Sequence, residues 1–178
     1  GFQQVRDPSA LFLDQTIGAA SIVRSDGPSV LTILVGQLAD NTLEGVDVRE
    51  TNFVNDSFLV GLTYQVEMGP RGLTLDSGLY TILDERSIDR PLQLNTFVFG
   101  GRFDRNGYSA WGHGVGQFGR WSNAGVAGQD QTIMAWAAQI GAGRRRGAWQ
   151  WSANVFALSG DDEHHGNGHQ GAFFGSGK

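Results

Sequence analysis

The chain has 178 residues with a formal net charge of −5, and it contains 27 glycines but no cysteine. The lack of cysteine excludes disulfide bonds, thiolate chemistry and zinc sites built on cysteine, and the acidic balance does not favour a nucleic-acid partner. No run of about twenty apolar residues is present, so the sequence predicts no transmembrane helix.

The length is that of one domain, and we expect residues 1–178 to form a single β-barrel domain that is incomplete at both ends. The chain begins at Gly1 without an initiator methionine or a signal peptide. Its last residues, Phe173–Lys178, have the composition of a loop interior. We therefore expect this chain to be a segment of a longer protein.

The first part of the chain predicts two strands and a long loop. Gly1–Ser9 ends in an Asp-Pro-Ser triplet, which is a turn or loop signal. Leu11–Arg24 predicts a strand, Ser25–Pro28 a tight turn, and Ser29–Leu38 a strand that is apolar on both faces. Ala39–Asp56 is long and polar, so we expect an exposed loop there.

The segment Ser57–Met68 has the clearest pattern in the chain. Apolar and polar residues alternate, with Phe58 and Leu62 on one face and Thr63 and Glu67 on the other. Period-two alternation predicts a strand with one apolar and one polar side. Beyond a tight turn, Leu73–Leu83 alternates in the same way, and a charged loop follows it.

The stretch from Thr96 to Leu158 predicts two further hairpins. Tight turns at Asp104–Gly107 and Arg144–Gly147 close the hairpins, and the longer polar loop Gly119–Asp130 separates them. The expected strands are Thr96–Phe103, Tyr108–Phe118, Thr132–Gly143 and Ala148–Leu158.

Strand length and connection length together indicate the fold class. The expected strands have about ten to twelve residues, whereas soluble strands cluster near five or six and a membrane-crossing strand needs about nine to eleven. Tight turns alternate with long loops, which is typical of outer-membrane barrels. We expect an all-β, antiparallel up-and-down transmembrane β-barrel, present here as a segment of about eight strands that does not close on itself. A soluble β-sandwich or a lipocalin-like barrel is the alternative.

Several motifs resemble the alginate-export family of outer-membrane proteins. They are Gln117-Phe118-Gly119, the Ala-Trp-rich strand Ala135–Gly141, the loop entry Ser159–Asp162 and the segment His169–Phe174. The strand Thr96–Phe103 is also similar to a strand of that family, and the resemblance extends over residues 92–174. It implies a monomeric barrel that passes an anionic polysaccharide outward.

Polar residues on the predicted inward faces are candidates for a path through the lumen. Amides, hydroxyls and glycines on these faces suit water and sugar hydroxyls, and lumen-facing side chains tune selectivity. We expect Arg102 and His113 on one wall, with His113 the deeper of the two. The alternative is that these side chains bond to one another and fill the barrel. The candidates are Gln65, Glu67, Arg102, His113, Gln117, Gln139, Gln150 and Asn154.

The polar loop after the last strand has a second interpretation as a metal site, because imidazole and carboxylate ligands suit divalent metals. A solvated acidic loop is the alternative. The candidate ligands are Asp161, Asp162, His164, His165 and His169.

No Gly-x-Ser-x-Gly or His-Glu-x-x-His motif is present, so we expect neither enzyme activity nor a cofactor. The expected function is a porin-like channel of the bacterial outer membrane that passes a hydrophilic solute, with alginate-like polysaccharide export as its specific form. The expected partners are the lipid bilayer with its lipopolysaccharide, a saccharide solute and periplasmic export partners, but no nucleic acid. The alternatives are a structural or adhesive outer-membrane barrel with binding loops, and a soluble ligand-binding β-barrel.

Overall fold

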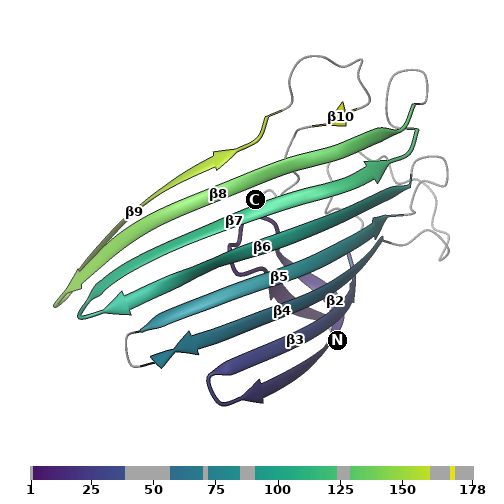
Figure 1. Cartoon of the computed structure of the whole chain (residues 1–178). Coiled ribbons are helices and arrows are strands. Elements are labelled where there is room, and N and C mark those ends of the chain that lie inside the picture. The colour runs from purple at the N-terminus through teal and green to yellow at the C-terminus, as the bar shows by residue number, and fades with distance from the viewer. Residues whose placement is uncertain are drawn as a thin grey trace.

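The computed structural model describes residues 2–38, 57–69, 72–84, 91–123, 129–160 and 169–170. These residues form one ten-stranded sheet (Figure 1). Its strands are β1 (Phe2–Arg6), β2 (Asp14–Asp26), β3 (Ser29–Gln37), β4 (Ser57–Met68), β5 (Leu73–Asp84), β6 (Leu92–Arg105), β7 (Tyr108–Trp121), β8 (Gln131–Arg146), β9 (Trp149–Leu158) and β10 (His169–Gln170).

The strands from β1 to β9 form an up-and-down meander, in which each pairs antiparallel with its neighbours in sequence. The short β10 runs parallel to β8, on the side of β8 that β9 also occupies. Within the described residues no pairing joins β1 to β9, so the sheet is open. The predicted up-and-down arrangement and the predicted open sheet are both confirmed.

The beginning of the chain differs from the prediction. Gly1–Ser9 was expected to be a loop, but Phe2–Arg6 forms β1, which pairs with the start of β2. The five-residue strand is mostly polar and has no alternation that a sequence pattern could reveal, and it is held by backbone bonds to β2. The Asp-Pro-Ser triplet itself opens the connection from Asp7 to Leu13, as a loop signal should.

The predicted turn at Arg144–Gly147 is also shorter than expected. β8 continues through Arg146, β9 begins at Trp149, and Gly147 takes a positive φ of 60° that favours glycine. Arg144 stays in the strand, where its guanidinium carbon lies 4.6 Å from the centre of the Tyr108 ring on β7. Pairing with Trp151, Gln150 and Trp149 of β9 keeps all three arginines in the strand.

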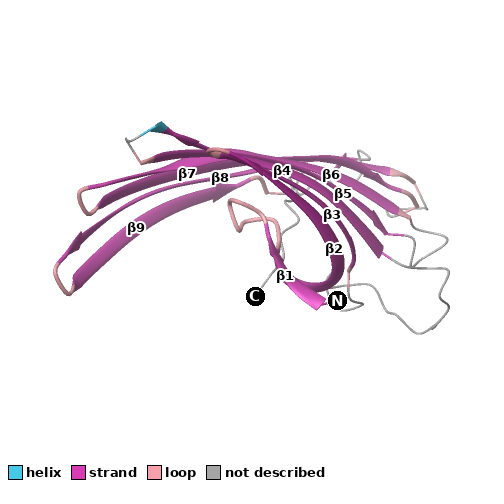
Figure 2. Ribbon diagram, turned by 90° about the horizontal axis from the view of Figure 1, so that it is seen from below, coloured by secondary structure: helices cyan, strands magenta, loops and turns pink. Residues whose placement is uncertain are grey.

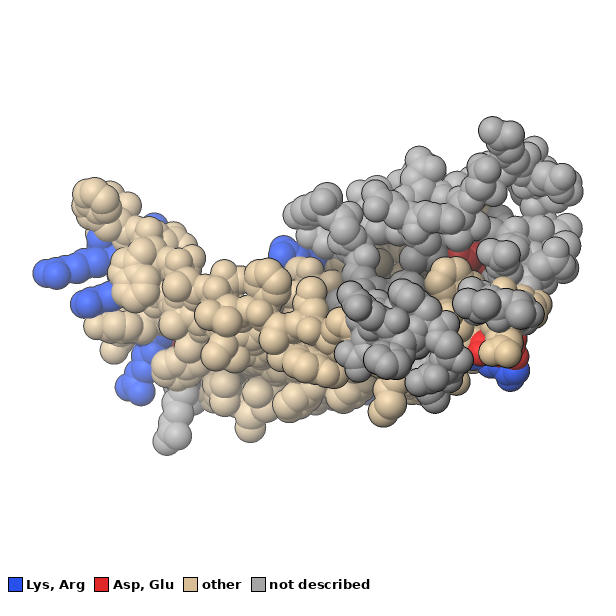
Figure 3. All heavy atoms as spheres, turned by 90° about the horizontal axis from the view of Figure 1, so that it is seen from above, with Lys and Arg blue, Asp and Glu red and all other residues tan. Residues whose placement is uncertain are grey.

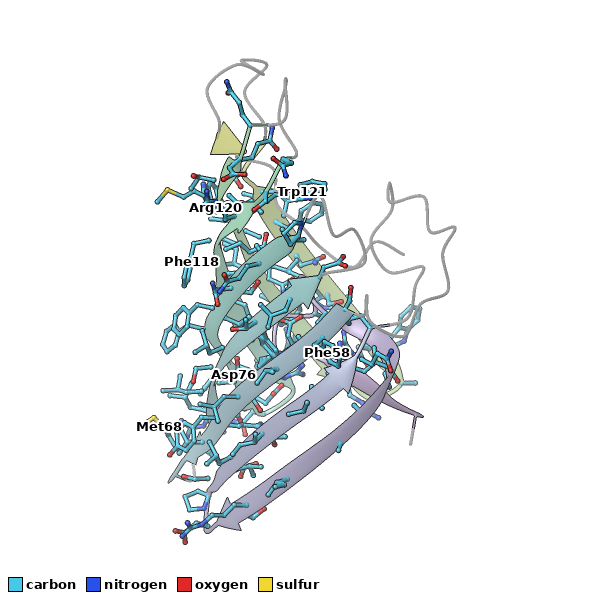
Figure 4. The ribbon with its side chains drawn as sticks, turned by 90° about the vertical axis from the view of Figure 1, so that its right-hand side faces the viewer. Phe58, Met68, Asp76, Phe118, Arg120 and Trp121 are labelled. Atoms are coloured by element: carbon cyan, nitrogen blue, oxygen red, sulfur yellow. The ribbon has the colours of Figure 1, made fainter. Side chains whose placement is uncertain are left out.

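The sheet is strongly curved, and its two faces differ in composition. The loop that follows β1 lies in the hollow of the curve (Figure 2). Phe58 and Leu62 point away from this hollow, with 47% and 44% of their surfaces exposed. The predicted outward face of β4 is therefore confirmed. Figure 4 shows the same alternation on β7, where Phe118 and Trp121 point to opposite sides of the sheet.

The buried core lies on the concave face, at its end near the long connections. We call this region the apolar half. It differs from the prediction that the inward positions carry mainly amides, hydroxyls and glycines, because neighbouring strands place aliphatic side chains at matching register positions there. Its buried apolar residues are Leu34, Leu59, Tyr80, Ile82, Leu94, Val98, Val115 and Ile133.

Candidate functional site

The connection between β1 and β2, residues 7–13, is a compact loop built around the buried carboxylate of Asp7. This carboxylate accepts hydrogen bonds from the backbone N–H groups of Ser9 (2.9 Å), Phe12 (3.1 Å) and Leu13 (2.6 Å), and from the Ser9 hydroxyl. The backbone N–H of Asp7 donates to the carbonyl oxygen of Leu13 at 2.9 Å, which closes the loop. The loop is thus held in one shape by its own bonds, as Asx turns are.

This loop covers the apolar half of the concave face. The Phe12 ring packs against the Tyr80 ring of β5 with 5.6 Å between centroids. On the opposite side of the hollow, the Gln139 side-chain amide of β8 donates to the carbonyl oxygen of Ser9 at 2.6 Å. The loop therefore connects β5 to β8 across the curve of the sheet, and Phe12 and Leu13 complete the core.

The rest of the concave face, toward the tight turns, is polar. We call this region the polar half. It consists of two adjacent rows of side chains that cross the sheet from β4 to β9. The first row contains Gln65, Asp76, Gly100, His113, Gln139 and Phe156, and the second contains Glu67, Thr74, Arg102, Trp111, Gly141 and Asn154.

The two rows bring most of the predicted lumen residues together. Six of the eight candidates stand in them: Gln65, Glu67, Arg102, His113, Gln139 and Asn154. The other two lie elsewhere. Gln117 is buried in the apolar half, where its side-chain nitrogen lies 3.4 Å from the Thr96 hydroxyl. Gln150 pairs in register with Arg145 beside the β8–β9 turn.

At the centre of the first row, His113 of β7 meets Asp76 of β5 across the glycine of β6 that lies between them. The His113 Nε2 atom lies 3.2 Å from the Asp76 Oδ1 atom, and the two side chains are only 8% and 13% exposed. Gly100 makes room for this contact because it has no side chain. A Cβ atom at this position would overlap with the imidazole ring. Sequence analysis did not identify Asp76 as the partner of His113, since the two lie 37 residues apart.

In the second row, Arg102 of β6 is bound by Asp104, two residues further along the same strand. The Arg102 Nε atom donates to Asp104 Oδ2, and its NH2 group donates to Asp104 Oδ1 at 3.1 Å. The Arg102 side chain is 57% exposed. His113 pairs with Gly100 and therefore lies two register positions farther from the β6–β7 turn than Arg102, which pairs with Trp111. The positive charge of Arg102 is matched by a carboxylate within its own strand.

Trp111 of β7 is the aromatic side chain of the second row, between Arg102 and Gly141 in the register. Its indole lies directly over Gly141, where a Cβ atom would overlap with the ring. Sequence analysis did not single out Trp111. The sequence contained a signal for this contact, because the large Trp111 side chain stands opposite Gly141 on the next strand.

The convex face carries a band of apolar side chains between two polar borders. On β8 the band runs from Met134 to Ala142, with the arginines of the tight turn beyond it. Figure 3 shows basic side chains gathered at this end of the sheet. At the other border, the Arg120 guanidinium donates a hydrogen bond to the Asp130 carboxylate and forms an ion pair with it. This hydrogen bond holds the pKa of the Asp130 carboxyl below its usual value.

The proposed metal ligands Asp161, Asp162, His164 and His165 lie outside the described residues, and of His169 only the backbone is described, in β10. No group of three or more His, Asp or Glu side chains that could hold a metal ion occurs in the part of the chain that the structure describes. The described residues also include no helix long and apolar enough to cross a membrane.

No family model matches the chain, and no curated protein matches it. The resemblance to the alginate-export family therefore stays a prediction that depends on the motifs alone.

Proposed function

We propose that this sheet is part of the wall of an outer-membrane β-barrel that passes a hydrophilic saccharide through its lumen. The observation that carries the proposal is the apolar band on the convex face. On β8, residues 134–142 would extend about 30 Å along the strand and about 23 Å along the membrane normal at a tilt of about 40°, close to the lipid-facing band of such barrels, about 25 Å.

The composition of the band supports the same proposal. Soluble proteins rarely expose apolar patches larger than a few hundred Å², whereas here large apolar side chains stand exposed on every strand from β3 to β9. Those of the convex band include Ile33, Val35, Phe58, Val60, Leu62, Leu79, Phe97, Phe99, Phe118, Met134, Trp136, Ile140 and Val155. A bilayer is the environment that would cover all of them at once.

The open edges of the sheet show where a complete barrel would need further strands. β1 and β9 each lie at the end of the antiparallel meander, and β9 has exposed side chains over its whole length. A bare sheet edge in lipid leaves backbone N–H and C=O groups without partners. We propose that further strands pair with both edges and close the barrel.

The polar half of the concave face would line the passage. Its amides, hydroxyls and charged groups are suited to hydrogen bonds with water and with sugar hydroxyls. Export of an alginate-like polysaccharide is the specific form that the motifs suggest. In this arrangement the arginines of the tight turns would meet the phosphates at one membrane surface.

The test is conductance of the full-length protein in planar lipid bilayers. We expect discrete open channels whose current is reduced by an added saccharide. A protein that inserts but shows neither conductance nor block by any saccharide would contradict the proposal.

One observation favours a second candidate, the structural barrel. The loop of residues 7–13 occupies the hollow and bonds to β8 through Gln139, as a plug in a closed barrel would. The same conductance measurement separates the two, because a structural barrel inserts without conducting.

A further inference from the structure

The indole of Trp111 forms a platform on the polar half of the concave face. Three of its ring atoms, Cε2, Cζ2 and Nε1, are the nearest neighbours of the position that a Cβ atom of Gly141 would take. The ring therefore fills the space that a side chain at position 141 of β8 would take. Trp111 is neither buried nor fully exposed, so part of its surface stays accessible on the concave face.

Hydrogen-bonding groups surround this platform at matching register positions. Thr74 and Arg102 precede Trp111 in its row, Asn154 follows it, and His113 and Gln139 occupy the adjacent row. The Arg102 guanidinium carbon lies over the indole, 6.0 Å from its centre, so a ligand on the platform would also meet this charged group. An aromatic surface with a few placed polar groups is the usual composition of a small-molecule site.

The charges of the same rows decide which solute fits. Among the described residues of these two rows and of the next row toward the tight turns, carboxylates outnumber guanidinium groups. The carboxylates are those of Glu67, Asp76 and Asp104, and the guanidinium group is that of Arg102. Arg102 is already engaged by Asp104, and Asp76 lies against His113. A polyanion would therefore meet carboxylates within about one Debye length, about 8 Å at physiological salt.

We infer that Trp111 is the stacking platform of a saccharide subsite, and that its ligand is an uncharged sugar rather than the polyuronate that the alginate-like motifs suggest. A pyranose ring presents C–H groups on its faces and hydroxyl groups around its rim. The faces pack on an indole, while the rim bonds to amides and carboxylates such as those of Asn154 and Glu67. The inference depends on the proposed function, which makes the concave face the lining of a passage.

The experiment measures saccharide binding to the protein purified in detergent, by titration calorimetry. The two probes are an uncharged hexasaccharide of glucose and a hexasaccharide of a uronic acid. Trp111→Ala removes the platform, and Trp111→Phe keeps an aromatic ring. Trp136→Ala is the matched control, because Trp136 is 52% exposed on the convex face.

We expect the uncharged hexasaccharide to bind more tightly than the uronic acid one. Trp111→Ala should weaken its binding about tenfold, the equivalent of an aromatic contact, Trp111→Phe should weaken it about threefold or less, and Trp136→Ala should leave it unchanged. Equal affinities of the wild-type protein and Trp111→Ala, or tighter binding of the uronic acid probe by the wild-type protein, would overturn the inference.

A charge variant keeps the test decisive if Trp111→Ala does not fold. The double variant Glu67→Gln with Asp104→Asn removes two carboxylates and leaves the platform in place, so the preference for the uncharged probe should shrink. An unchanged preference would contradict the charge argument. If the wild-type protein conducts in bilayers but fails these binding tests, only the subsite is refuted. If the protein binds sugar without conducting, the proposed function is refuted.

Discussion

At the scale of single residues, rings that lie over glycines shape the concave face. The Tyr80 ring lies beside Gly61, where a Cβ atom would come within 2.9 Å of it, and His113 lies against Gly100. Because these rings occupy the space of missing side chains, each glycine is a packing partner. The sequence alone shows the inward glycines and the large inward residues, but it does not show which of them pack together across neighbouring strands.

Gly100 and Gly114 offer a matched pair of substitutions. A Cβ atom at Gly100 would overlap with the Gly112 carbonyl oxygen and with the His113 ring, whereas one at Gly114 would meet no atom within 4 Å. We expect Gly100→Ala to lower the free energy of unfolding by about 1–3 kcal/mol, the usual cost of overpacking, and Gly114→Ala to change it little. Urea unfolding in detergent micelles measures both, and equal effects would contradict the packing described for His113.

Arg102 offers a test of ion selectivity. A carboxylate at position 102 would lie beside Asp104 and lose the bidentate pairing, so Arg102→Glu should lower the permeability of anions relative to cations more than Gln150→Ala does. Reversal potentials of the full-length protein in a salt gradient measure this ratio. An unchanged ratio in Arg102→Glu would show that this side chain does not face the conducting path.

Asp104 illustrates how far the site could be predicted from the sequence. Six candidates were found because inward polar positions on alternating strands must share a face. Asp104 was assigned to a turn, so its pairing with Arg102 was missed, although residues two apart on a strand point to the same side. The contact of Asp76 with His113 depends on the register of three strands, which a single sequence does not specify.

At the scale of elements, β4 and the loop of residues 7–13 are opposite cases. The alternation of β4 predicts both its limits and its faces, because one side is apolar throughout. The loop is recognisable as a loop from its Asp-Pro-Ser triplet, but its position in the hollow follows from tertiary contacts with Tyr80 and Gln139. No local pattern distinguishes a loop that folds inward from one that points to solvent.

The Asp7 carboxylate should determine the stability of this loop. Asp7→Ala leaves the backbone N–H groups of Ser9, Phe12 and Leu13 without their acceptor. We expect a loss of about 2–3 kcal/mol in the free energy of unfolding, while Asp26→Ala, at an exposed position before the β2–β3 turn, should cost about 0.5 kcal/mol or less. Urea titration of both variants provides the measurement, and a loss at Asp7 no greater than at Asp26 would show that the loop does not depend on this carboxylate.

The loop should also restrict the passage that the concave face would line. Phe12→Ala removes the contact with Tyr80, and Gln139→Ala removes the bond to Ser9. Because both changes weaken the attachment of the loop, we expect a larger or more variable single-channel conductance in the double variant than in the wild type. Conductance identical to the wild type would mean that the loop does not lie in the conducting path.

At the scale of the whole molecule, the sheet has an apolar convex face and a concave face that is half polar. The sequence predicted the long strands, the meander and the open edges from strand length and connection length. It did not predict the apolar half of the concave face, because Leu59, Leu94 and Ile133 become neighbours only through the register of the intervening strands. The register is also what places the polar residues in two rows.

The most direct test of the account asks which face meets lipid. The chain has no cysteine, so single cysteines can be introduced at convex positions (Leu62, Phe99) and at concave positions (Thr63, Glu67), and each can carry an environment-sensitive fluorophore. After reconstitution of the full-length protein into vesicles, labels at Leu62→Cys and Phe99→Cys should emit at shorter wavelength and be quenched by brominated lipids, while labels at Thr63→Cys and Glu67→Cys should be quenched only by aqueous iodide. Quenching of the concave labels by lipid, or of the convex labels by iodide alone, would contradict the assignment of the convex face to the bilayer.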